Sequence, residues 1–155
     1  MKRVAVLLAE GFEEIEALAP VDLLRRAGVE VFTVGEYVVK GSRNISVVTD
    51  KRVSDFLQEC ESQGLPDAVI IPGGLNGTKN LAACTKAQNF IIKMWQENKL
   101  VCAICAAPVI VLSPLGILKK KNLLATLLWK MSFKNMLVKT GKKKFLVQHT
   151  KKKML

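Results

Sequence analysis

The hydrophobic pattern of the chain alternates between short uninterrupted apolar runs and longer segments whose apolar residues recur at helical spacing. Apolar runs without polar positions are typical of parallel strands that are buried on both faces. Strands that alternate with amphipathic helices predict an α/β fold with a flavodoxin-like, doubly wound and mostly parallel sheet. The predicted strands are residues 3–8, 29–34, 67–71 and 100–104, and the predicted helices are 13–27, 53–61, 86–98 and one that begins at 106.

Two further segments predict a small excursion from this sheet. Residues 36–40 and 45–48 are short and rich in valine and isoleucine, and Gly41 and Ser42 join them in a hairpin-like connection. From residue 119 onward the alternation of strands and helices stops. We therefore expect an α/β domain over residues 1–118, with incomplete C-terminal elements, followed by a poorly ordered Lys-rich tail over residues 119–155.

The charge of the chain is confined to this tail. The 155 residues are 50% hydrophobic, enough for a packed core, and the formal net charge is +11. Residues 1–118 hold 12 Lys and Arg against 13 Asp and Glu, whereas residues 119–155 hold 12 Lys and no acidic residue. Because the tail lacks arginine and regularly spaced aromatic residues, we expect no nucleic-acid binding.

The same composition predicts a cytoplasmic protein without a membrane anchor. The apolar run at residues 4–9 is too short for a signal peptide and leads directly into acidic residues. The longest apolar stretch, residues 101–118, contains Pro108, Pro114 and Gly116, which argue against a membrane span. The chain has four cysteines, which we expect to be free thiols.

Candidate chemistry lies where three predicted strands end, because sites in such sheets form at the carboxyl ends of the strands. The three segments are residues 9–16, 72–77 and 102–108. Cys105 occupies a strand-to-helix turn in the last segment, where a helix N-terminus favours the thiolate form of its side chain. This position suits a nucleophile, although spacing alone supports a buried structural cysteine equally well.

Neighbouring segments offer groups that could assist a thiolate. Glu16 lies early in the first helix, where burial beside a thiolate would raise its pKa and let it shuttle a proton. Interaction with the helix N-terminus accounts for a carboxylate there as well. Gly73 and Gly74 end a buried strand, and their backbone N–H groups could stabilise an oxyanion or simply form a turn.

Other patterns in the chain are weaker. Cys102 and Cys105 have CxxC spacing, but Cys102 is expected within a strand, unlike the cysteines of thioredoxin-type motifs. A zinc site would need a second cysteine pair, whereas Cys60 and Cys84 are isolated, so we expect no metal site. The single histidine, His149, could pair with a cysteine only if the tail folded back over the sheet.

Taken together, these residues resemble the ThiJ/PfpI superfamily, whose fold is class I glutamine amidotransferase-like. The similarity is to the Parkinson disease protein 7-like branch, which includes glyoxalase III and proposed deglycases. The resemblance runs from Arg3 to about Leu118. It is carried by AEGFEEIEA at 9–17, PVDLLRRAG at 20–28, GSR at 41–43, IPGG at 71–74 and AICAAP at 103–108.

The resemblance implies a role for each matching position. Cys105 would be the reactive, oxidation-prone cysteine, and Glu16 the protonated glutamate that is hydrogen-bonded to it. Arg43 would lie near a dimer-associated site. The oxyanion and substrate-binding positions would be Gly73, Gly74 and Ala106.

The implied activity is a glutathione-independent glyoxalase reaction, from glyoxal or methylglyoxal to glycolate or lactate, or a deglycase-type reaction on glycated substrates. The enzyme would be a homodimer that needs no metal or organic cofactor. Two alternatives remain open. One is a redox-sensing or chaperone-like stress protein that uses oxidation of Cys105 as a switch. The other is an inactive, truncated family member.

The C-terminal tail departs from the family pattern, which continues with a histidine or tyrosine near the cysteine, further strands and a closing helix. A shifted reading frame explains the difference. Back-translation of residues 124–140 in the shifted frame permits Cys-His-Pro-Ser followed by acidic helix residues, and the lysine run at 119–121 is a natural site for a gained or lost base. We therefore predict that the tail is out of frame.

Overall fold

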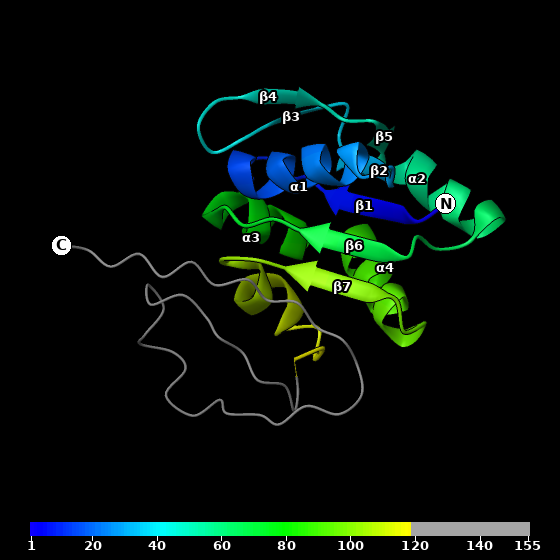
Figure 1. The fold of residues 1–155 in the computed structure, drawn as a ribbon. Coiled ribbons are helices and arrows are strands. Elements are labelled where there is room, and N and C mark those ends of the chain that lie inside the picture. Colours follow the sequence, from blue (N-terminus) through cyan, green and yellow to red (C-terminus); the bar gives the residue numbers. More distant parts are fainter. Residues whose placement is uncertain (119–155) are drawn as a thin grey trace.

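The computed structural model describes residues 1–118, which form an open sheet with helices packed on both of its faces (Figure 1). Five parallel strands form this sheet in the order β5-β2-β1-β6-β7. The predicted doubly wound, flavodoxin-like α/β fold is confirmed. The elements are β1 (Arg3–Leu7), α1 (Glu14–Arg26), β2 (Glu30–Gly35), β3 (Val38–Lys40), β4 (Ser46–Val48), β5 (Lys51–Arg52), α2 (Val53–Gln63), β6 (Ala68–Ile71), α3 (Leu75–Ala83), α4 (Thr85–Gln96), β7 (Leu100–Ala103) and the π-helix η1 (Pro108–Leu112).

Strand β1 lies at the centre of the sheet because its side chains are apolar on both faces. It pairs with β2 on one side, from Arg3 opposite Glu30 to Leu7 opposite Val34, and with β6 on the other. The chain reverses direction along the sheet at β1, since β2 and β5 lie to one side and β6 and β7 to the other. Sites in open α/β sheets form at such a switch point, beyond the carboxyl ends of the strands.

Two hydrophobic cores hold the helices against the two faces of this sheet. The larger core lies under α2, α3, α4 and η1, and contains Phe56, Phe90 and Met94 at 4% exposure or less. The smaller core lies under α1 and includes Phe12 and Val21. Burial of these side chains supplies the main favourable term for folding.

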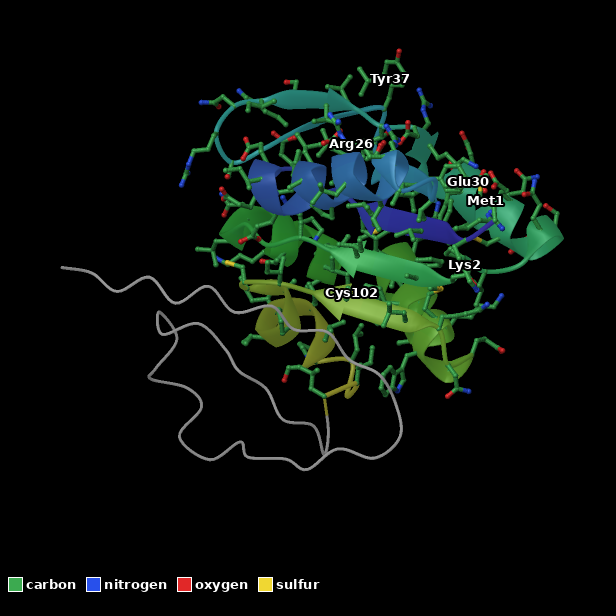
Figure 2. All side chains as sticks on the ribbon, viewed as in Figure 1. Met1, Lys2, Arg26, Glu30, Tyr37 and Cys102 are labelled. Atoms are coloured by element: carbon green, nitrogen blue, oxygen red, sulfur yellow. The ribbon has the colours of Figure 1, made fainter. Side chains whose placement is uncertain are left out.

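The predicted hairpin excursion is also confirmed. Strands β3 and β4 pair antiparallel and lie apart from the main sheet (Figure 1). Tyr37, at the start of this hairpin, is 59% exposed and points away from both cores (Figure 2).

Three elements differ from the sequence prediction. Helix α3 is not among the predicted helices, because it follows Pro72-Gly73-Gly74 and contains Gly77, a weak helix former. Its buried residues, Gly77, Thr78 and Leu81, nevertheless share one helical face. Strand β5 has only two residues, too few to give a periodic signal. The helix expected to begin at residue 106 is a π-helix, in which Ser113 N–H donates to the Pro108 carbonyl oxygen at 3.0 Å.

Some sequence-based predictions concern residues 119–155 and lie outside the described residues. They include the reading-frame shift, the disorder of the tail and the placement of His149. Within residues 1–118, no helix is long and apolar enough to cross a membrane. The same residues contain no cluster of three or more His, Cys, Asp or Glu side chains arranged to hold a metal ion.

A carboxylate between β4 and β5 fixes the outer edge of the sheet. Asp50 Oδ2 accepts hydrogen bonds from Thr33 N–H at 2.7 Å, from the Thr33 hydroxyl at 2.6 Å and from Arg25 Nη2 at 2.6 Å. Partial burial would raise the pKa of Asp50, but the Thr33 and Arg25 interactions outweigh it and lower the pKa. A lowered pKa in the folded state means that ionised Asp50 stabilises the fold.

Replacement of this carboxylate should make stability less dependent on pH. The contribution of Asp50 is present above the ordinary carboxyl pKa of about 4 and is lost as pH falls through the lower folded-state value. We expect Asp50→Asn to reduce the free energy of unfolding by about 1 kcal/mol at pH 7 and by much less at pH 3. Urea unfolding at both pH values measures this. Asp22→Asn, which removes an exposed ion pair with Arg26, is the control and should have little effect at pH 7.

Candidate functional site

The turn after β7 places Cys105 in an unusual backbone conformation. Its φ angle is +60°, in the left-handed region that non-glycine residues rarely adopt. Two other non-glycine residues within residues 1–118 have positive φ, and both are asparagines, which tolerate this region well. Cys105 is exposed, while the following Ala106 and Ala107 are buried. The turn therefore places a thiol at the carboxyl edge of the sheet, the geometry of a nucleophile on a strand-to-helix turn.

Gly73 lies between Cys105 and the carboxylate of Glu16. Its N–H donates to Glu16 Oε2 at 2.8 Å. A side chain at this position has no room: a Cβ atom would lie 2.7 Å from Cys105 Cβ and 3.1 Å from Cys105 Sγ, and would also collide with Glu16 Oε2. A glycine here therefore lets a thiol from the β7 turn and a carboxylate from α1 meet across the end of β6.

Burial and mutual repulsion make the thiol and the carboxyl difficult to ionise together. Burial raises the pKa of Glu16, although the Gly73 N–H opposes the increase. Burial also raises the pKa of the Cys105 thiol, and the adjacent Glu16 carboxylate raises it further. The direction of the Glu16 pKa agrees with the sequence expectation, whereas the expected preference for the Cys105 thiolate is wrong, because burial first and Glu16 second raise the pKa of the thiol. Because ionised Glu16 raises the pKa of Cys105, the two groups lose their protons in sequence, and the pair holds one proton between the two steps.

Two backbone amides act against the increase in the pKa of the Cys105 thiol. The N–H groups of Ala106 and Gly74 form hydrogen bonds with the Cys105 sulfur, and both lower its pKa. These are the two amides that the sequence resemblance assigned to an oxyanion pocket. They converge on the sulfur from different elements, one from the β7 turn and one from the N-cap of α3. A negative charge that develops on sulfur, or on an oxygen bonded to the adjacent carbon, would meet these donors.

Close packing of backbone holds the loop after β1 against the loop after β6. Glu13 N–H donates to the Gly73 carbonyl oxygen at 3.0 Å, and Gly77 N–H donates to the Gly11 carbonyl oxygen at 3.1 Å. Gly74 has a φ of +92°, and a Cβ there would lie 2.8 Å from Glu13 N. These contacts fix the start of α1, and with it Glu16, relative to Gly73 and Gly74. The three strand ends expected to form one site are thus brought together.

A buried carboxylate beside the site was missed in the sequence analysis. Glu14 is only 4% exposed, and its Oε1 accepts a hydrogen bond from Arg43 N–H at 2.6 Å. The Ser42 hydroxyl lies 3.1 Å from Glu14 Oε2 and 2.8 Å from Glu13 Oε2. Burial would raise the pKa of Glu14, but the hydrogen bonds from Arg43, Ser42 and neighbouring amides outweigh it and lower the pKa.

Glu14 therefore anchors the loop between β3 and β4 to the first turn of α1. Charge complementarity at a helix N-terminus would account for a carboxylate at this position, but Glu14 shares the buried face of α1 with Ala17 and Val21. That spacing of three and four residues was a signal that the side chain points inward. The anchored loop carries Arg43, whose side chain is exposed and forms no ion pair within residues 1–118.

The other cysteines occupy different environments. All four cysteines are free thiols, as expected. Cys102 lies within β7, also as expected, and burial raises its pKa. Cys60 is buried in α2, where burial likewise raises its pKa.

Comparison with known proteins identifies the family to which the chain belongs. A model of the DJ-1/PfpI family matches residues 2–149, which contain every element of the site. The chain belongs to the DJ-1/PfpI family. The resemblance inferred from the sequence motifs is therefore confirmed.

Relatives in this family match the chain over much of its length. The Parkinson disease protein 7 homolog of Danio rerio is 36% identical over 115 residues, covering 72% of this chain and 59% of that protein. Protein/nucleic acid deglycase 2 of Escherichia coli (strain K12) is 31% identical over 115 residues, covering 72% and 64%. Protein DJ-1 homolog A of Arabidopsis thaliana is 38% identical over 123 residues, covering 77% and 30%. The chain thus spans less than two thirds of the length of each of these relatives.

Solved structures of DJ-1 proteins share the fold. Oxidized DJ-1 of Toxoplasma gondii superimposes with a TM-score of 0.82 at 29% identity, covering 95% of this chain and 81% of that chain. A cysteine-to-alanine variant of a DJ-1 superfamily protein from Salmonella typhimurium gives a TM-score of 0.80 at 35% identity, covering 95% and 80%.

The close approach at Gly73 is open to a direct test. We expect Gly73→Ala to separate the Cys105 thiol from the Glu16 carboxyl, because the added Cβ would overlap both side chains. The pH profile of Cys105 alkylation by iodoacetamide should shift, and the free energy of unfolding should fall by about 1–3 kcal/mol.

The matched control for this substitution is Gly28→Ala. Gly28 also has positive φ, at +76°, but no atom lies within 4 Å of an added Cβ. This change should cost stability through backbone strain alone and leave the alkylation profile as in the wild type. An unchanged profile in Gly73→Ala would show that Gly73 does not set the geometry of the pair.

Proposed function

We propose that this chain is a cysteine-dependent enzyme that acts on small α-oxoaldehydes or on the adducts they form, as a glyoxalase or a deglycase-type enzyme. The observation that carries the proposal is the convergence of the Cys105 thiol, the Glu16 carboxyl and two backbone amides around Gly73. The family relationship supports the same class of activity, since one relative is a protein/nucleic acid deglycase. We place the reaction in the cytoplasm, in keeping with four free thiols.

The first step uses the one proton that the pair retains. Transfer of the thiol proton to Glu16 gives a thiolate beside a neutral carboxylic acid, so the pair carries a single negative charge before and after the transfer. The Cys105 thiolate then adds to the aldehyde carbon of methylglyoxal and forms a hemithioacetal. The N–H groups of Gly74 and Ala106 stabilise the alkoxide that develops on the former carbonyl oxygen.

The second step moves a proton between two carbon atoms. After the alkoxide is protonated, the Glu16 carboxylate removes the hydrogen from the hemithioacetal carbon, which gives an enediolate, and returns a proton to the adjacent carbon. The product is a 2-hydroxyacyl thioester on Cys105. Water cleaves the thioester, which releases lactate and restores the thiol. Glyoxal follows the same route to glycolate, and no external oxidant, metal or cofactor takes part.

Oxidation of Cys105 is the second candidate function, as part of a redox-sensing or chaperone-like stress protein. Cys105 is an exposed residue whose sulfur already accepts two backbone hydrogen bonds, and Glu16 could donate a further one to a sulfinate oxygen. One structural relative is an oxidized DJ-1. This function needs the thiol at the surface but no bound aldehyde.

We also propose that the chain forms a homodimer through α1 and the hairpin. Ile15 on α1 is 77% exposed, Ile45 is 52% exposed and Val48 is 62% exposed. The anchor at Glu14 joins the two elements that carry these residues. Exposed apolar side chains on adjoining elements are typical of a protein interface. Arg43 lies between Ser42 and Ile45 in the same loop, so it would lie close to that interface.

The catalytic proposal predicts a strict dependence on one thiol. Cys105→Ser should abolish the appearance of lactate from methylglyoxal, whereas Cys102→Ser, three residues earlier in β7, should retain most of the activity. Glu16→Gln should lower kcat by about 10²-fold or more, the usual contribution of a general acid–base. Enzymatic measurement of lactate with each purified variant provides the data.

The outcome distinguishes the alternatives. If the reduced wild-type chain releases no lactate but Cys105 is oxidised selectively by peroxide, the redox function replaces the enzymatic one. If there is no turnover and no cooperative unfolding transition, the chain is the inactive, truncated family member.

The homodimer is tested by a charge placed on the proposed interface. Val48→Lys should convert the dimer to a monomer, because a lysine in the apolar interface would be desolvated without a partner. Leu23→Lys, at a position that is 65% exposed near the other end of α1, should leave the dimer intact. Sedimentation equilibrium measures both variants, and a wild-type chain that is monomeric at every concentration contradicts the proposal.

A further inference from the structure

Thr78 is a buried polar residue of α3 that takes no part in the reaction steps described above. The residue is only 1% exposed. Its hydroxyl donates to the Gly74 carbonyl oxygen at 2.8 Å, and the Leu75 carbonyl oxygen lies 3.1 Å away. Its backbone N–H donates to the same Gly74 oxygen at 2.9 Å. Two donors from one residue therefore hold the carbonyl group of Gly74.

Gly74 needs this support because its own backbone is conformationally permissive. Its φ of +92° and ψ of 120° are accessible to glycine at little cost, but so are many other conformations. Gly74 is also the N-cap residue of α3, and as a glycine it has no side chain that could cap the helix. The direction of its N–H group is thus set by the hydrogen bonds that its neighbouring peptide groups make.

The peptide groups on both sides of the Gly74 Cα atom are held. The first is a planar unit that contains the Gly73 carbonyl and the Gly74 N–H. The Gly73 oxygen accepts a hydrogen bond from Glu13 N–H at 3.0 Å, and the Gly74 N–H faces the Cys105 sulfur. The second peptide group contains the Gly74 carbonyl, which Thr78 holds. Loss of either restraint would free the glycine to rotate its N–H away from the sulfur.

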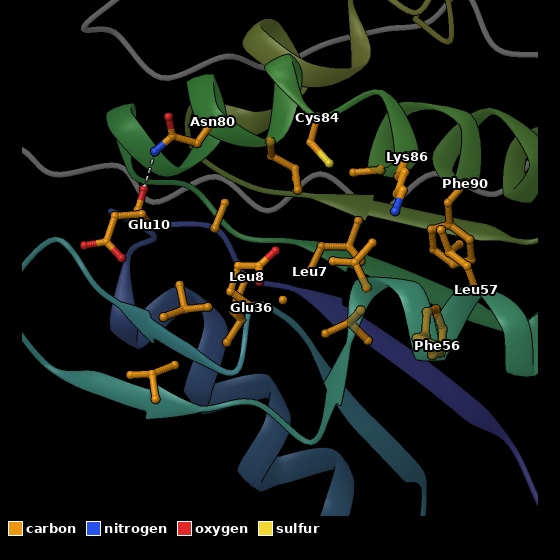
Figure 3. A pocket seen from close by; sticks show the side chains of 18 residues that line it. Leu7, Leu8, Glu10, Glu36, Phe56, Leu57, Asn80, Cys84, Lys86 and Phe90 are labelled. Carbon is orange, nitrogen blue, oxygen red and sulfur yellow. Dashed lines mark hydrogen bonds between the residues drawn. The ribbon is translucent and has the colours of Figure 1, made fainter.

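The second half of α3 is less closely packed than its start. Asn80 and Leu81 line a cavity of about 290 Å³, which lies between α3, α4, α2 and the ends of β1 and β2 (Figure 3). Asn80 Nδ2 donates to the Glu10 carbonyl oxygen at 2.8 Å beside this cavity (Figure 3). A cavity removes the close contacts that otherwise fix a helix. Hydrogen bonds near the start of α3, those of Thr78 among them, therefore matter more for the position of Gly74.

We propose that Thr78 is a positioning residue for the oxyanion donor of the site: its hydroxyl holds Gly74 so that the Gly74 N–H points at Cys105. A threonine hydroxyl that bonds the carbonyl four residues earlier is common in helices. Here that carbonyl belongs to the residue whose own N–H meets the sulfur. The same N–H would meet the alkoxide of the hemithioacetal, so the catalytic consequence rests on the proposed function, whereas the effect on the Cys105 thiol does not.

Removal of the hydroxyl at constant shape tests this role. The Gly74 N–H lowers the pKa of the Cys105 thiol, so its displacement should move the pH profile of Cys105 alkylation to higher pH. We expect Thr78→Val to slow alkylation by iodoacetamide about threefold at pH 7, the effect of one weakened hydrogen bond. Glu16 and the Ala106 N–H, which also act on the sulfur, are present in this variant.

Turnover provides the second readout. The kcat for methylglyoxal should fall about tenfold in Thr78→Val, less than the loss of an entire oxyanion donor. The KM should stay near the wild-type value, because the Gly74 N–H acts on charge that develops in the transition state.

Three further variants separate the hydroxyl from the rest of the side chain. Thr78→Ser and Thr78→Ala differ from each other only in the hydroxyl group. The serine variant should retain the wild-type alkylation profile and the alanine variant should show the shift, and this pair decides the question even if Thr78→Val does not fold. Thr49→Val is the matched control, because Thr49 is also buried and its hydroxyl donates to the Glu36 carbonyl oxygen at 2.7 Å. It should change neither the alkylation profile nor kcat.

The alkylation profile decides the proposal. An unchanged profile in Thr78→Val and Thr78→Ala, with only a lower free energy of unfolding in urea, would mean that the hydroxyl stabilises α3 without positioning Gly74. A serine variant that behaves like the alanine variant would overturn the proposal as well. If the wild-type chain releases no lactate, the proposed enzyme fails, while a shifted profile in the two variants without the hydroxyl still supports the role of Thr78.

Discussion

The close approach of three chain segments at Gly73 is the constraint on which the rest of this site depends. The backbone N–H of Gly73 bonds Glu16, its carbonyl oxygen bonds Glu13 N–H, and its missing side chain leaves room for Cys105. These contacts require β1, β6 and β7 to end at the same edge of the sheet, which parallel pairing in this strand order ensures. The order of the strands thus determines which side chains meet at the site.

The electrostatics of the site follow from that approach. A carboxyl and a thiol that meet in a half-buried position cannot both be ionised at low cost, so one proton stays with the pair. The backbone amides of Gly74 and Ala106 lower the pKa of Cys105, because they stabilise negative charge on sulfur without adding a charged side chain. The positive φ of Cys105 stores strain in the turn, and the surrounding packing of Ala106 and Ala107 holds it there.

The sequence was informative where physical signals are local and strong. Uninterrupted apolar runs predicted the four long strands, and the motifs around Cys105 and Gly73 predicted the family. Helix α3 was missed because Gly77 lowers its helix propensity, and its packing against Gly11 and Phe12 is a tertiary contact. The anchoring role of Glu14 was missed because a carboxylate at a helix start has a simpler local explanation. The cavity could not be predicted, since its walls come from elements far apart in the sequence.

The proposed selectivity for Cys105 over the other cysteines rests on its position and not on residue type. Cys60 and Cys102 both have a pKa raised first by burial, and for neither do backbone amides oppose the increase. Cys105 has a raised pKa as well, but it is exposed, it accepts two amide hydrogen bonds, and its proton has a nearby acceptor in Glu16. A thiolate there can form when a substrate arrives, because the transferred proton remains within the site. The reactivity that we propose for Cys105 therefore arises from a route for its proton and from donors for the resulting charge, even though its pKa is raised in the free site.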